Sequence, residues 1–143
     1  MQIEVKINLI LHATENKERV LERLENIFKI KQDIFKIQEI PGHFNNPILL
    51  ISSILKKSIA KNFTIIFFSK MEKDDFEYIY ENVDECVTSA GLSLRISKQK
   101  LVSEIVKISK EDSIKINIST PVYIKSETKM IYQKLMKNDT KST

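Results

Sequence analysis

The chain has 143 residues, a formal net charge of +4, 42% hydrophobic residues and a single cysteine, Cys86. This composition is too apolar for a disordered chain, and the length is that of one domain. No apolar run approaches the roughly 20 residues needed to span a bilayer, and one cysteine excludes an internal disulfide or a Cys-cluster zinc site. We therefore expect one cytoplasmic domain over residues 1–137, with a frayed tail at 138–143 and no membrane association.

The first half of the chain predicts the order strand, helix, strand, strand, helix. Apolar and polar residues alternate over 3–11, which indicates a strand with one buried face. Thr14 is the expected N-cap of the next helix. That helix should bury one stripe of apolar residues, namely Val20, Leu21, Leu24, Ile27 and Phe28. Two further strands are expected at 34–40 and 48–54.

Residues 63–68 are ambiguous between helix and strand. Their β propensity is strong, but apolar residues recur at helical spacing through this part of the chain. The recurring positions are Leu55, Ile59, Phe63, Phe67 and Met71. Because the periodicity extends over several turns, we predict a helix.

The second half begins with an acidic helix, in which Asp74 and Glu77 form a D-x-x-E capping pattern and which Gly91 should end. Strands are expected at 92–97, 102–108 and 114–120. Ser126 should then cap a short helix that packs Ile131 and Leu135 on the core. The resulting order, β-α-β-β-α-α-β-β-β-α, predicts an α+β fold of two layers. Helices should cover one face of a mostly antiparallel, mixed sheet and leave the other face open for binding.

The charge is unevenly distributed along the chain. Residues 72–85 hold seven acidic residues and one lysine, so the remainder carries a net charge of +10. A basic surface favours a polyanionic partner such as RNA. Solvated lysines are the alternative, since all but three of the 23 basic residues are lysine. Charge alone leaves both interpretations open.

The loop at 41–47, with the sequence PGHFNNP, is the most unusual segment. Glycine and asparagine tolerate left-handed φ and each proline fixes its own φ, so we expect a defined shape. The loop is longer than a tight hairpin needs, which suggests a binding role. Its side chains can hydrogen-bond and stack, but they supply no nucleophile.

Three segments carry a family resemblance: HATE at 12–15, GHFNNPI at 42–48 and LRISKQ at 94–99. They resemble the HATE turn, the GHYGNPI loop and the LRLDKQ strand end of a small archaeal family. That family is described as RNA-binding proteins or predicted exosome subunits. The resemblance extends over nearly the whole chain in the order of elements. It implies a fold similar to that of the 5S-rRNA-binding ribosomal protein. The chain departs from the family at Phe44, Asn45 and Ser97, where the family has Tyr, Gly and Asp.

The resemblance and the side-chain chemistry together define an expected RNA-contact set. Its members are His12, Thr14, Gly42, His43, Phe44, Asn45, Asn46, Arg95, Lys98 and Gln99. Arginine can hold a phosphate through two parallel hydrogen bonds, lysine acts as a point charge, and carboxamides and rings can contact bases. This hypothesis requires the 41–47 loop to meet Arg95 in one cationic pocket. The alternative is that Arg95 pairs with a carboxylate and Asn46 caps a turn.

The leading functional hypothesis is a non-catalytic RNA-binding protein, an accessory to RNA processing, the exosome or ribosome assembly, with no cofactor and no metal. One alternative is a protein-interaction or structural subunit that uses the acidic helix and the open sheet face. Another is a ribonuclease in which His12 and His43 act as general acid and base. The sequence has no Gly-rich phosphate loop, nucleophile elbow or zinc spacing. Cys86 is expected to be an unreactive, partly buried residue.

Overall fold

A computed structural model gives the fold and describes residues 2–42 and 46–138. In this part of the chain the strands form one antiparallel sheet in the order β2-β3-β1-β6-β5-β4. The strands are β1 (Glu4–Leu11), β2 (Lys36–Pro41), β3 (Pro47–Lys56), β4 (Val87–Thr88), β5 (Gly91–Ser97) and β6 (Ser113–Ser119). The helices are α1 (Lys17–Phe28), α2 (Lys57–Lys70), α3 (Lys73–Glu81), α4 (Val83–Cys86), α5 (Lys98–Val102) and α6 (Thr128–Met136). Two short 3₁₀ turns are η1 (Gln32–Ile34) and η3 (Lys125–Glu127).

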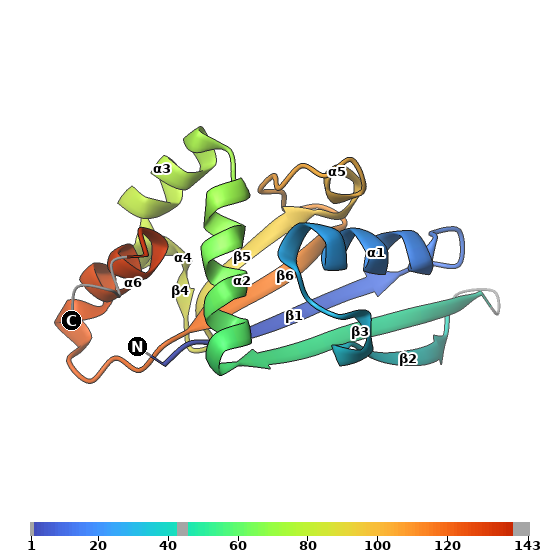
Figure 1. Ribbon diagram of the computed structural model, residues 1–143, viewed down its shortest axis with the longest axis horizontal. Coiled ribbons are helices and arrows are strands. Elements are labelled where there is room, and N and C mark those ends of the chain that lie inside the picture. Colours follow the sequence, from blue (N-terminus) through green and yellow to red (C-terminus); the bar gives the residue numbers. More distant parts are fainter. Residues whose placement is uncertain (1, 43–45, 139–143) are drawn as a thin grey trace.

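Helices α1 and α2 lie across one face of the sheet (Figure 1). The burial of β1 alternates accordingly, with Val5, Ile7 and Leu9 buried and with Asn8 and Ile10 exposed on the opposite side. The predicted two-layer α+β fold is therefore confirmed. The face of the central strands that points away from α1 and α2 is called the open face below. Among the described residues, no helix is both long enough and apolar enough to cross a membrane.

The core forms where the apolar stripe of α1 meets α2 and the sheet. All five residues predicted for the α1 stripe are buried. The rings of Phe28, Phe63 and Phe67 are packed together, with centroids 4.7 Å apart for Phe28 and Phe63 and 5.6 Å apart for Phe63 and Phe67. Residues 63–68 lie within α2, so the prediction of a helix there is confirmed. Ile59, another of the recurring apolar positions predicted for the helix that is now α2, is 50% exposed.

Each of the three predicted helix caps is wrong in detail. Asn16, rather than Thr14, caps α1, because its side chain accepts a hydrogen bond from the Arg19 amide at 3.0 Å. Asp74 lies inside the first turn of α3, whose N-cap is Glu72 and has no side-chain cap. Ser126 lies in η3, and α6 begins after Glu127. In α6, Leu135 is buried as predicted, whereas Ile131 is only half-buried.

The predicted strand at 102–108 is also wrong. Ser97 accepts a hydrogen bond from the Lys100 amide at 3.0 Å and thereby starts α5, which occupies 98–102. After α5 the chain makes only single bridges, at Val106 and Ile108. Gly91 does not end the acidic helix, because the chain has already formed β4 by then. Its φ of +101° instead serves the turn into β5.

Candidate nucleic-acid interface

A row of polar side chains crosses the open face from β2 to β5. The strand register sets Lys36 opposite Ser52, Ser52 opposite Asn8, Asn8 opposite Lys115, and Lys115 opposite Arg95. Residues directly opposite one another project from the same face of a sheet, so the five side chains share the open face. Three of the five are cationic and none is acidic. We call these five residues the basic row.

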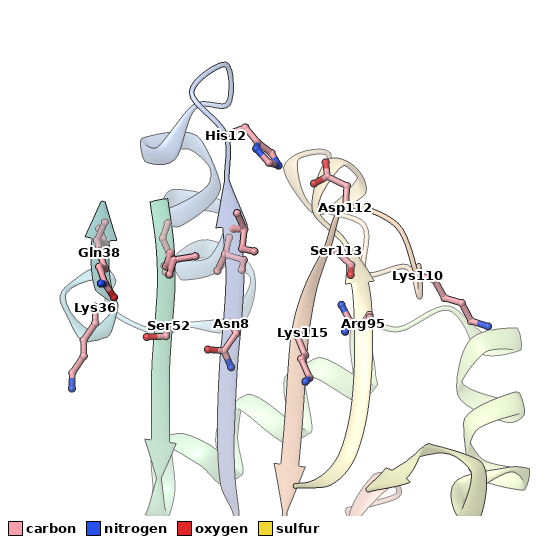
Figure 2. Close-up of a pocket in the computed structure, with 15 residues that line it drawn as sticks. Asn8, His12, Lys36, Gln38, Ser52, Arg95, Lys110, Asp112, Ser113 and Lys115 are labelled. Atoms are coloured by element: carbon pink, nitrogen blue, oxygen red, sulfur yellow. The ribbon is translucent and has the colours of Figure 1, made fainter. Parts of the chain in front are cut away.

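The basic row lies in a shallow cavity of about 820 Å³. Figure 2 shows its side chains at one level across five neighbouring strands, with His12 and Asp112 near one end of the strands. Four steps between strands separate Lys36 from Arg95, which corresponds to about 19 Å across the sheet. A surface of this width can contact more than one phosphate of a nucleic acid at the same time.

Arg95 and Lys115 hold like charges on adjacent strands. Neither residue forms an ion pair with a carboxylate anywhere in the described chain. The alternative in which Arg95 is neutralised by a carboxylate is therefore not observed. Like charges directly opposite one another destabilise a sheet, and a bound anion would relieve that repulsion.

A second cavity, of about 510 Å³, adjoins Arg95 on the side of α3 and α4. The Tyr78 hydroxyl there donates a hydrogen bond to Glu85 Oε2 at 3.2 Å. The negative charge of Glu85 raises the pKa of the Tyr78 hydroxyl above its ordinary value. Burial, and then the Glu85 charge, raises the pKa of the Cys86 thiol. Because the thiol stays protonated at neutral pH, it is a poor nucleophile, in line with the prediction for Cys86.

Lys98, one of the predicted RNA contacts, is only 2% exposed. Its Nζ donates to the Ile10 carbonyl oxygen at 2.6 Å and lies 2.9 Å from both Glu15 Oε2 and Asp112 Oδ1. These contacts join α5 to the end of β1, to the turn before α1 and to the loop before β6. The charge of Lys98 is thus paired with two carboxylates of the protein itself. A contact between Lys98 and RNA remains a prediction.

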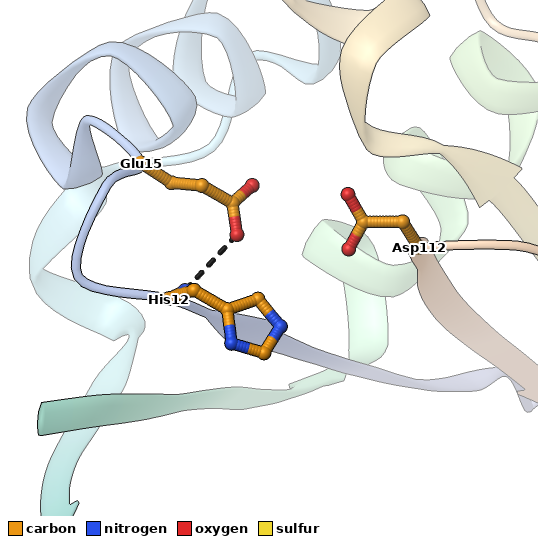
Figure 3. Close-up of side chains that lie close together, drawn as sticks. All are labelled: His12, Glu15 and Asp112. Atoms are coloured by element: carbon orange, nitrogen blue, oxygen red, sulfur yellow. Dashed lines mark hydrogen bonds between the residues drawn. The ribbon is translucent and has the colours of Figure 1, made fainter. Parts of the chain in front are cut away.

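His12, Glu15 and Asp112 lie close together at the end of β1 (Figure 3). The His12 amide donates to Glu15 Oε1 at 3.0 Å, and one potential metal-ligand atom from each residue lies within 4.8 Å of the others. The ammonium of Lys98, however, already lies within ion-pairing distance of both carboxylates. The chain thus supplies the positive charge that these two acids need, and the geometry does not call for a metal ion.

Four of the predicted contacts meet in a cavity of about 660 Å³ near this cluster. They are His12, Thr14, Lys98 and Gln99. Thr14 and Gln99 are exposed, and Arg19 of α1 lines the same cavity. His12 also lines the cavity of the basic row, so the two hollows adjoin at this residue.

The 41–47 loop is described only at its two ends. Gly42 is half-buried, and a Cβ there would collide with the backbone oxygen of Asn46 and with the Ile48 side chain. Glycine is thus required by close packing. Asn46 is exposed. The predicted contacts His43, Phe44 and Asn45 lie outside the described residues.

The expected single pocket joining this loop to Arg95 does not form between the described parts. The loop connects β2 and β3, while β1 and β6 separate β3 from β5. Neither Gly42 nor Asn46 lines the cavity that contains Arg95. That cavity is lined instead by His12 and the other residues of the basic row.

A family model described as RNA binding matches residues 4–120. The chain belongs to this RNA-binding family. RNA-binding protein PAB1135 of Pyrococcus abyssi is 33% identical over 126 residues, which are 83% of this chain and 82% of that protein. The structures of SSO0741 from Sulfolobus solfataricus and Mth689 from Methanothermobacter thermautotrophicus are each 21% identical, with TM-scores of 0.76 and 0.69. They cover 95% and 99% of this chain and 98% of their own chains, and they show a shared fold.

These relatives all come from archaea, and the resemblance to an archaeal RNA-binding family is confirmed. The exosome and ribosomal-protein parts of that resemblance stay predictions. Within the family fold, the sequence-based contact set includes Arg95 but omits Lys36, Ser52, Asn8 and Lys115. A signal exists for Asn8 and Lys115, which occupy polar positions in strands that alternate polar and apolar residues. It does not exist for Lys36 and Ser52, because β2 has no buried face and Ser52 lies between the apolar residues Leu50 and Ile54 on its side of β3. Without the strand order, moreover, the pattern does not reveal that these residues form one row.

Proposed function

We propose that this protein binds RNA without cleaving it, through the basic row of the open face. The observation that carries the proposal is the unneutralised pair Arg95 and Lys115, aligned with Lys36 on a surface that no helix of the described chain covers. Phosphates supply the opposite charge, and Asn8 and Ser52 between the cations offer hydrogen bonds to sugar hydroxyls. Membership of the RNA-binding family supports RNA as the polyanion.

Direct binding measurements test this proposal. We would titrate a labelled RNA hairpin and a single-stranded RNA of equal length with the wild type and with the Arg95→Ala/Lys115→Ala variant, over a range of salt concentrations. The variant should bind more weakly, and its log affinity should depend less steeply on log salt, by about 0.7–0.9 for each phosphate that it no longer neutralises. Lys129→Ala/Lys134→Ala on α6 is the matched control, since it removes two exposed charges elsewhere. Equal affinities for the two double variants would reject the basic row as the interface.

The absence of catalysis is part of the proposal. Glu15 and Asp112, the carboxylates beside His12, are held by Lys98 and are poorly placed to shuttle protons. His43, the second histidine of the ribonuclease alternative, lies outside the described residues. Incubating the same RNAs with wild type and His12→Ala protein tests this point. Cleavage that the wild type performs and His12→Ala loses would establish the ribonuclease instead.

We further propose that the protein acts in the cytoplasm as an accessory to RNA processing by the exosome or to ribosome assembly. Crosslinking in a cell lysate, followed by sequencing of the attached RNA, tests this role with Arg95→Ala/Lys115→Ala as the control. Enrichment of ribosomal RNA precursors or of exosome substrates that depends on the two cations is the expected result. Recovery of the same RNAs with the variant would contradict it.

A protein partner for the acidic helices is the second candidate. Glu77 and Glu81 of α3 and Asp84 of α4 are exposed. Lys73 forms an exposed ion pair with Glu77 at 4.0 Å, and Lys107 engages Glu72 and Asp75, so Glu81 and Asp84 are the charges available to a basic partner. Changing these three acids to lysine should abolish binding of such a partner and leave RNA affinity unchanged or higher. A loss of RNA affinity would show that the acidic surface takes part in RNA binding.

A further inference from the structure

The second cavity beside Arg95, which lies on the side of α3 and α4, continues the surface of the basic row. Arg95 and Lys115 line both this cavity and the cavity of the row, so the two hollows share cationic side chains. We call the second hollow the Tyr78 cavity. Its volume is about 510 Å³, within the roughly 300–1,000 Å³ of small-molecule sites. An RNA strand whose phosphates contact Arg95 and Lys115 can therefore place a neighbouring base in it.

The Tyr78 cavity combines apolar residues with an exposed aromatic ring. Ile79 and Leu94 line it and are buried, and Ile108 is half-buried. Tyr78, in contrast, is 58% exposed, and no aromatic ring of the described residues packs on it. An exposed ring beside unpaired cations is typical of surfaces on which nucleic-acid bases stack.

Glu85 places hydrogen-bond acceptors beside this ring. Its Oε2 accepts a hydrogen bond from the Tyr78 hydroxyl at 3.2 Å, which holds the carboxylate at the cavity. Within the described chain the carboxylate accepts no other hydrogen bond and forms no ion pair. An ionised carboxylate has about four acceptor positions, so most of them are free. The carboxylate repels a phosphate, and its natural ligand is an uncharged group that carries N–H donors.

We infer that the Tyr78 cavity binds an unpaired guanine base of RNA that lies on the basic row, an inference that rests on the proposed function. The base stacks on the Tyr78 ring, and its N1–H and N2 amino groups donate to Glu85. Guanine fits best because its Watson–Crick edge carries two adjacent donors, which match the two oxygens of one carboxylate. Uracil offers a single N–H between two carbonyl groups. Because that edge must be free, the RNA is single-stranded at this point.

Binding of short RNAs tests the base preference. The probes are a fluorescently labelled oligouridine and the same oligonucleotide with one central guanosine. The wild type should bind the guanosine-containing RNA more tightly by about fivefold or more, which is the discrimination of a good bidentate contact. Glu85→Gln should bring this ratio close to one, because the new amide group faces a donor of guanine. Loss of the negative charge should raise the affinity for both RNAs, so only the ratio reports on base recognition. Equal wild-type affinities for the two RNAs would overturn the inference.

The stacking contact is tested by changing the ring. Tyr78→Ala should lower the affinity for the guanosine-containing RNA by about fivefold or more, the usual effect of removing a stacking ring. Tyr78→Phe keeps the ring and should retain most of the affinity. Tyr123→Ala is the matched control, because Tyr123 is 92% exposed and lines neither cavity. A Tyr78→Ala protein that binds this RNA as tightly as Tyr123→Ala would contradict the stacking contact.

The double variant of the basic row separates this inference from the proposed function. Suppose that Arg95→Ala/Lys115→Ala weakens the binding of both RNAs, but Glu85→Gln leaves the guanosine preference unchanged. RNA then binds the row, and the inference about the Tyr78 cavity fails. Suppose instead that Arg95→Ala/Lys115→Ala binds as tightly as Lys129→Ala/Lys134→Ala, and Glu85→Gln still abolishes the preference. The proposed function then fails, and the Tyr78 cavity stands as the guanine site.

Discussion

Arg95 of β5 lies directly opposite Lys115 of β6 on the open face. Two like charges in register repel each other, so this pair lowers the stability of the sheet while it offers a bidentate anion site. Lys115→Glu should reverse both effects. We expect the free energy of unfolding to rise by about 0.2–1 kcal/mol in urea denaturation, because the new pair attracts. RNA affinity should fall in the same variant.

The matched control for this prediction is Lys129→Glu, an equal charge change on the exposed side of α6. It should leave stability nearly unchanged and weaken RNA binding only through net charge. If Lys115→Glu lowers stability, the repulsion between Arg95 and Lys115 is not felt in the free protein. The basic row would then need another explanation.

Lys98 is predicted to be a structural residue, because its buried ammonium joins two carboxylates and the Ile10 carbonyl. Lys98→Met would leave Glu15 and Asp112 facing each other without the cation. Since both carboxylates reach solvent, we expect a loss near the low end of the roughly 3–5 kcal/mol seen when one partner of a buried ion pair is removed. Urea denaturation measures it. Adding Glu15→Gln and Asp112→Asn should restore part of the loss. A Lys98→Met protein of wild-type stability would contradict the prediction.

The fold could be predicted well where one physical signal dominates. The alternation over β1 identified its buried face, and the stripe of α1 identified its core residues without error. The prediction for α2 succeeded because Phe63 and Phe67 are one helical turn apart and pack on Phe28. In each case the periodicity extended over several turns or residues, so a local exception such as Ile59 did not change the result.

The wrong predictions of helix caps and of one strand are explained by local competition between residues. Residues 102–108 contain enough apolar side chains for a strand, but the Ser97 cap starts a helix just before them. Thr14 and Asn16 are both good caps, and only the turn between His12 and Glu15 selects Asn16. Predicting the candidate site requires more information than predicting a helix cap, because Lys36 and Arg95 lie in one row only through the order of five strands. That order depends on long-range pairing, which no local pattern encodes.

Gly91 is predicted to be irreplaceable in the turn between β4 and β5. Its φ is +101°, and a Cβ would collide with the backbone oxygen of Ile118 in the neighbouring strand. Gly91→Ala should therefore lower the free energy of unfolding by about 1–3 kcal/mol, the usual cost of a residue in a disfavoured backbone conformation. Ser89→Ala, an exposed change in the same turn, should have little effect on thermal unfolding. Equal melting temperatures for the two variants would contradict this role.

Cys86 should react slowly with thiol reagents, since burial and then the charge of Glu85 raise its pKa. The thiolate attacks iodoacetamide and displaces iodide, so the reaction rate should increase with pH and reach its midpoint above that of the urea-unfolded protein. The raised pKa also contributes stability that is present below the unfolded pKa and is lost as the pH rises through the folded value. Glu85→Gln should lower the midpoint only in part, because burial is the larger cause. A midpoint in the folded protein at or below the unfolded one would show that the thiol is activated, and Cys86 would then be a candidate reactive residue beside Arg95.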